Sequence, residues 1–124
     1  MQKTLVLALA ATSQLAAPPA GATAMLENYF ECTTNEGVTF NDVVAFKNEY
    51  EAAVQAAGIE GYNLKVMFPV YDSQIGEGHF TWYGSFATNT VWAQAGDWFH
   101  SSEWPARFNA MMNCQSSSLW RADD

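Results

Sequence analysis

The sequence predicts one α+β domain whose elements follow in the order strand, helix, strand, strand, helix, strand. Three observations lead to this fold class. Four stretches alternate apolar and polar residues with the period of two that is typical of a strand. Two further stretches repeat apolar residues every three or four positions, as an amphipathic helix does. Aromatic residues make up 15% of the chain, which supplies the apolar area for a compact core.

The first 24 residues are expected to lie outside this domain. Lys3 precedes a short apolar run at 5–11, and small residues then lead to two Ala-x-Ala patterns ending at Ala22 and Ala24. This order is typical of a secretory signal peptide, and the run is far shorter than the roughly 20 residues of a membrane span. We therefore expect a signal peptide at 1–24, a single domain at 25–124, and a periplasmic or secreted protein.

The first half of the domain is predicted to contain a strand and the most regular helix. The strand is expected over 26–32. Its buried side is expected to carry Leu26, Phe30 and Cys32, and its other side Glu27, Tyr29 and Glu31. Thr39 can cap the helix, Asp42 favours the positive end of its dipole, and Gly58 ends it. The apolar stripe of this helix consists of Val43, Phe46, Tyr50, Val54 and Ala57.

The second half adds two strands, a helix and a last strand. A long strand is expected over 62–71, at a sheet edge because Pro69 cannot donate a ladder hydrogen bond. A hairpin loop at 72–78 leads to a strand that places Phe80, Trp82 and Phe86 on its buried side. Thr88 can cap the second helix, which stalls at 101–102, and further helical turns are expected over 103–112. The last strand is expected over 114–122.

This element order is the split β-α-β unit repeated twice, a ferredoxin-like βαββαβ plait. Right-handed crossovers then place the first and third strands side by side in the centre of a four-stranded antiparallel sheet. The last strand is expected beside the first, the second strand at the other edge, and the helices on one face.

The two cysteines are expected to form a disulfide. Cys32 lies near the end of the first strand and Cys114 near the beginning of the last, and these ends are neighbours in the predicted sheet. An exported chain meets an oxidising compartment, where such a bond persists. A metal site would need more ligands at close spacing, so we expect no metal at these residues.

Charge and motifs exclude several classes of function. The chain has 13 acidic and five basic residues, with a formal net charge of −8. Nucleic acids and anionic lipid surfaces both require clustered Lys and Arg, so neither is an expected partner. Signatures of serine hydrolases, zinc proteases and phosphate loops are missing, and no cofactor is expected. His79 and His100 are the only side chains whose unperturbed pKa lies near neutral pH. Asp72 and Glu77, in one loop, are expected to be solvated.

The sheet face without helices is the predicted surface of interest. Strand alternation places these residues on it: Tyr29, Glu31, Lys65, Met67, Tyr71, Thr81, Tyr83 and Ser85. An open face that carries Tyr and Met requires a cover, a second subunit or a ligand, because large exposed apolar patches are uncommon on monomers.

The second helix carries a family resemblance. Trp98-Phe99-His100 is followed by Ser102-Glu103-Trp104 and Phe108. Together with the element order over 26–122, this stretch resembles the dimeric α/β-barrel superfamily, whose members are ferredoxin-like plaits that pair their sheets. The resemblance implies a homodimer with a cavity between sheet and helices. It implies no catalytic residue, because the superfamily has no single one.

Three functional hypotheses follow. The first is a dimeric domain that binds a small apolar or aromatic ligand, or a protein partner. Its site would be lined by Tyr29, Met67 and Tyr83, with His79 or His100 as polar contacts. The second is a small cofactor-independent monooxygenase or isomerase, with His100 as base and Trp98 shaping the pocket. The third is a structural component of an envelope or secreted assembly.

Overall fold

The computed structural model describes residues 24–70 and 79–123. Its elements are β1 (Ala24–Thr34), α2 (Phe40–Ala56), β2 (Tyr62–Met67), β3 (Phe80–Phe86), α3 (Asn89–His100), α4 (Trp104–Met111) and β4 (Met112–Ala122). Apart from Ala24, the expected signal peptide lies outside the described residues, as do Tyr71 and the loop with Asp72 and Glu77.

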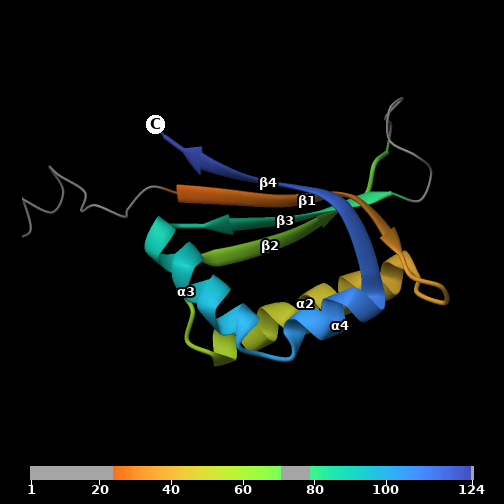
Figure 1. Ribbon diagram of the computed structural model, residues 1–124, viewed down its shortest axis with the longest axis horizontal. Coiled ribbons are helices and arrows are strands. Elements are labelled where there is room, and N and C mark those ends of the chain that lie inside the picture. Colours follow the sequence, from red (N-terminus) through yellow and green to blue (C-terminus); the bar gives the residue numbers. More distant parts are fainter. Residues whose placement is uncertain (1–23, 71–78, 124) are drawn as a thin grey trace, which may run out of the picture.

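The four strands form one antiparallel sheet in the order β2-β3-β1-β4. Figure 1 shows α2, α3 and α4 on the same side of this sheet, while β4 curves from the helix layer to the sheet edge. The α+β class and the antiparallel sheet are thus confirmed, and the strand order is the expected one. The third helix departs from a simple βαββαβ plait.

Helix α4 is separate because serine side chains end α3. The hydroxyl groups of Ser101 and Ser102 donate to the backbone oxygens of Trp98 and Phe99, at 3.1 and 2.7 Å. In a longer helix these carbonyl oxygens would accept from backbone N–H groups of the next turn; here the serine hydroxyl groups satisfy them instead. The turns expected over 103–112 therefore form a helix of their own, and β4 begins two residues earlier than expected, at Met112.

Helix α2 begins at the predicted cap. Thr39 Oγ1 accepts from the backbone N–H of Asp42 at 3.1 Å, and the Asp42 carboxylate accepts from the backbone N–H of Thr39 at 2.8 Å. This reciprocal pair is a capping box. Gly58 follows the helix with a φ of 76°, a left-handed conformation that favours glycine. The predicted stripe is buried except for Ala57, which is exposed beyond the last turn.

The core is an aromatic cluster between α2 and β3. Tyr50 is 2% exposed and Trp82 3% exposed, and their ring centres are 6.0 Å apart. The Tyr50 ring also lies 5.1 Å from both Trp104 and Phe108 of α4. Large rings that touch at these distances bury much apolar area. The cluster therefore holds α2, α4 and the sheet together.

The side chains of β1 do not keep the predicted alternation. Tyr29 pairs with Trp82 and Cys32 pairs with Phe80, so β1 uses three steps where β3 uses two. This is a β-bulge, and it coincides with a φ of 51° at Glu31. Tyr29 and Cys32 consequently share one side of the strand although one number is odd and the other even. The expected placement of Tyr29 on the open face is wrong.

The second strand is shorter than expected. β2 ends at Met67, so Pro69 lies beyond the ladder. β2 is an edge strand, as predicted, but Pro69 is outside the ladder and does not impose this position.

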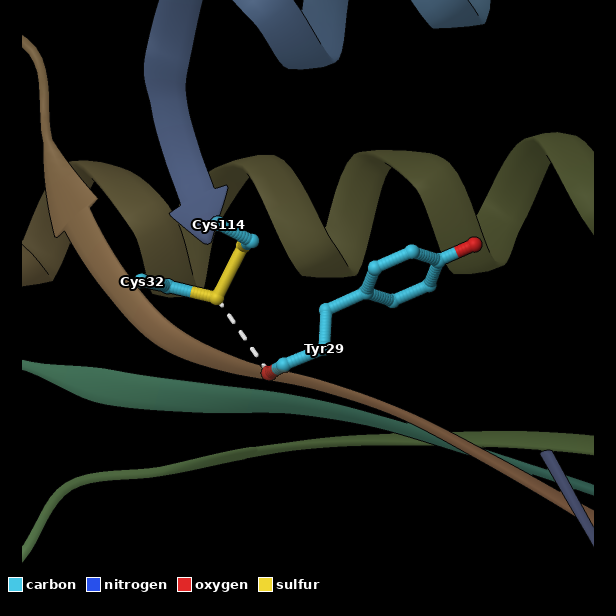
Figure 2. Close-up of a disulfide and its surroundings, with 3 residues drawn as sticks. All are labelled: Tyr29, Cys32 and Cys114. Carbon is cyan, nitrogen blue, oxygen red and sulfur yellow. Dashed lines mark hydrogen bonds between the residues drawn. A yellow bond between two sulfur atoms is a disulfide. The ribbon is translucent and has the colours of Figure 1, made fainter. Parts of the chain in front are cut away.

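The predicted disulfide is confirmed. Cys32 and Cys114 are direct partners in the β1–β4 ladder, and their sulfur atoms are bonded at 2.05 Å. Figure 2 shows the disulfide and the Tyr29 side chain on the same side of β1. The Cys32 sulfur lies 3.2 Å from the Tyr29 carbonyl oxygen. Because the oxidised sulfur has no hydrogen, this is a close contact without a proton. A structural disulfide indicates an oxidising compartment.

Candidate functional site: an aromatic cavity between the sheet and α3–α4

A cavity of about 370 Å³ lies between the helix-facing side of the sheet and helices α3 and α4. Every described element contributes to its lining. The lining residues are Glu27, Tyr29, Tyr50, Tyr62, Trp82, Phe86, Trp92, Ala95, Gly96, Phe99, His100, Pro105, Phe108, Asn109, Met112, Asn113 and Cys114. Most are aromatic or apolar, and the volume falls in the range of small-molecule sites, roughly 300–1,000 Å³.

Glu27 of β1 places a carboxylate in this aromatic wall. Its Oε1 atom accepts from the Tyr29 hydroxyl at 2.7 Å, and its Oε2 atom accepts from the indole N–H of Trp92 in α3 at 2.9 Å. Its ladder partner in β3 is Gly84, which has no side chain. The two neutral donors therefore hold the carboxylate between the sheet and α3.

Three tyrosines around this carboxylate are held as neutral phenols. Burial raises the pKa of Tyr29, and the charge of Glu27 and the hydrogen bond to it act in the same direction. Burial also raises the pKa of Tyr50 to about 12, against an opposing contribution from its hydrogen bond with Tyr62. The Tyr62 pKa is raised well above its ordinary value, again chiefly by burial. The hydroxyl oxygens of Tyr50 and Tyr62 are 3.3 Å apart.

Gly96 leaves open space in the α3 wall. A Cβ atom added at this position would meet nothing within 4 Å. Glycine inside a helix costs about 1 kcal/mol relative to alanine, and no positive φ at this position requires it. The missing side chain therefore enlarges the cavity at some expense of helix stability.

Of the expected contacts His79, Trp98 and His100, only His100 lines the cavity. His100 lines the cavity at the exposed end of α3, with its ring 5.3 Å from that of Phe99. Trp98 does not line the cavity; its ring packs 5.7 Å from Tyr50. Trp92, six residues earlier in α3, lines the cavity where Trp98 was expected to do so. His79 precedes β3 and is not a lining residue.

Met67 and Tyr83 lie on the open face, as predicted, and so on the other side of the sheet from Tyr29 and the cavity. The ladders set Lys65 beside Tyr83, and Tyr83 beside Asn28. The neighbouring row joins Ser85, Leu26 and Trp120. Leu26, expected in the core, therefore faces outward. The predicted binding residues thus fall on two opposite sides of the sheet.

Sequence reasoning missed Glu27, Trp92 and Gly96 as site residues. Regular alternation places Glu27 opposite the buried side of the strand, because the bulge at Glu31 carries no sequence signal that distinguishes it from a regular strand. Trp92 fits the apolar spacing of a helix and carries no sequence signal of a polar role. The one usable signal was Gly96, a glycine inside an otherwise regular helical pattern.

Comparison with protein-family models, with curated proteins and with solved structures finds no match. Within residues 24–70 and 79–123, no group of three or more His, Cys, Asp or Glu side chains is placed to hold a metal ion. None of the helices in this part of the chain is long and apolar enough to cross a bilayer.

Proposed function

We propose that this chain is an exported binding domain that holds a small, mainly aromatic or apolar ligand in the cavity between the sheet and α3–α4. The observation that carries the proposal is the cavity itself, in which most lining side chains are aromatic or apolar and polar groups such as Glu27, His100 and Asn109 lie among them. Pockets of this volume and lining enclose small organic molecules. The site differs from the one expected on the open face, although Tyr29 and His100 belong to both.

The space at Gly96 supports a ligand-binding role over a purely structural one. A packed interior leaves few voids larger than a water molecule, because empty volume lowers stability. Here a helix carries a residue that weakens it and leaves volume open beside Trp92 and Phe99. A ligand in this volume accounts for both features.

The wider assignment is also a proposal. The strand order supports a ferredoxin-like fold of the dimeric α/β-barrel type, with α4 as an addition. The disulfide supports a periplasmic or secreted location, in agreement with the expected signal peptide. Pairing of two open sheet faces would form the homodimer.

The substitution Gly96→Leu tests the cavity. Leucine is a better helix former than glycine by up to about 1 kcal/mol, so the protein is expected to fold with at least its original stability. The side chain enters the open volume, and we expect binding of 2-phenylethanol, a neutral aromatic probe, to be lost. Trp82 and Trp92 line the cavity, so their fluorescence reports binding.

Ala93→Leu is the matched control, because Ala93 lies on the exposed side of the same helix. It should bind the probe as the wild-type protein does. Equal binding of the probe by the Gly96→Leu and wild-type proteins would overturn the proposed site.

A further inference from the structure

We propose that the ligand of this cavity is an organic ammonium ion, anchored by the Glu27 carboxylate. The inference rests on the proposed function and adds the chemical class of the ligand. It follows from the pairing of Glu27, the character of the walls and the charge of the chain.

The Glu27 carboxylate lacks a cationic partner among the described residues. Its two hydrogen bonds come from the neutral groups of Tyr29 and Trp92, and the four ion pairs in this part of the chain involve other carboxylates. Neither Lys nor Arg occurs among the lining residues. Glu27 is half-buried, and a carboxylate near a protein surface attracts a nearby cation more strongly than it would in bulk water. The structure thus presents a fixed negative charge without its counter-charge.

Glu27 also retains capacity to accept from a ligand. An ionised carboxylate offers roughly four lone-pair positions, and the contacts with Tyr29 and Trp92 use two of them. These contacts fix the side chain in one orientation, so little conformational entropy is lost on binding. An ammonium group donates up to three hydrogen bonds and would fill the remaining positions.

The aromatic walls suit both the charged group and the apolar part of an organic ammonium ligand. Indole and phenol rings attract a cation to their faces, most strongly when water is excluded. Trp82 of β3 and Trp92 and Phe99 of α3 contribute rings to the lining. The formal net charge of −8 further favours the approach of cations and disfavours anions.

A structural role for Glu27, tying β1 to α3 through Trp92, is the competing explanation. It predicts no preference between charged and neutral ligands. The test therefore compares 2-phenylethylammonium with 2-phenylethanol, which share the ring and chain and differ in the charged group. Binding is measured by tryptophan fluorescence and calorimetry on the wild-type, Glu27→Gln and Glu60→Gln proteins. Glu60 is exposed outside the cavity, so its variant controls for the change in net charge.

We expect the wild-type protein to bind the ammonium probe at least about tenfold more tightly than the alcohol. Glu27→Gln should remove this preference for the ammonium probe over the alcohol, and Glu60→Gln should keep it. Equal affinity for the two probes in the wild-type protein would overturn the ammonium assignment and leave the cavity proposal standing. Failure of both probes to bind would overturn both.

A second measurement covers the case in which Glu27→Gln does not fold. Added NaCl screens the attraction between a charged ligand and the carboxylate. In the wild-type protein, salt should weaken binding of the ammonium probe and leave binding of the alcohol nearly constant. Ammonium binding that is insensitive to salt and no tighter than that of the alcohol would overturn the assignment.

Discussion

At the scale of single residues, Glu27 determines the chemistry around it. A carboxylate on the helix-facing side of a sheet costs free energy unless its oxygens are hydrogen-bonded. Tyr29 and Trp92 supply those bonds, and the same negative charge contributes to the raised pKa of Tyr29 and Tyr50. The charge of one acidic side chain therefore helps to keep two neighbouring tyrosines protonated.

This coupling predicts a loss of stability in alkali. The pKa of Tyr50 is about 12 in the folded protein and 10.0 without burial. Below pH 10 the phenol is neutral in both states, and its contribution is fully present. Above pH 10 the unfolded chain loses the proton more readily, so the free energy of unfolding falls by roughly 1.4 kcal/mol per pH unit for this tyrosine. The fall continues until the pH passes the folded pKa.

Urea unfolding measured between pH 9 and 11 checks this expectation, together with the ultraviolet absorbance of tyrosinate. The Tyr62→Phe protein keeps the ring stack on Phe86, whose centres lie 4.3 Å apart, but removes one delayed ionisation. Its stability should decline less steeply with pH. Ionisation of all five tyrosines near pH 10 in the native protein would contradict the raised values.

At the scale of elements, local signals predicted most boundaries and failed at one bulge. Thr39 and Thr88 mark helix starts through side-chain bonds to nearby backbone N–H groups, which depend only on neighbours in sequence. Which side chains of β1 face the helices, in contrast, depends on the register of β1 with β3. One extra residue near Glu31 reverses the alternation. Glu27 and Tyr29 consequently line the cavity, and no periodicity in the sequence could show this.

The disulfide is the element-scale feature with the largest expected effect on stability. It joins β1 to the edge strand β4 across 82 positions in sequence. In the chain-entropy description, a loop of this length stabilises the fold by about 4 kcal/mol. The double variant Cys32→Ala/Cys114→Ala should lose approximately this amount in urea unfolding. Alanine is chosen because Cys32 is fully buried.

Wild-type protein treated with a reductant is the control for this double variant. Its free energy of unfolding should fall to a similar value. A loss below about 1 kcal/mol would show that the unfolded chain is not appreciably restricted by the bond.

At the scale of the whole molecule, the sheet has helices on one face and is open on the other (Figure 1). The sequence predicted this layering and the residues Met67 and Tyr83 on the open face, because β2 and β3 keep regular alternation. It did not predict Trp120 there, since the serines of β4 obscure its period. Trp120 is 59% exposed and Met67 45% exposed, and they lie on opposite edge strands.

Exposed large side chains at both edges predict that the open face pairs with that of a second copy. Burial of Trp120 in a homodimer would remove its apolar surface from water. We expect the wild-type protein to be dimeric by light scattering and native mass spectrometry, and Trp120→Lys to shift it to monomer, because the new charge would be desolvated at the interface. Val44→Lys, which adds the same charge on the exposed side of α2, should remain dimeric. A wild-type protein that stays monomeric at every concentration tested would contradict sheet pairing, while the cavity on the opposite side of the sheet would still be complete within one chain.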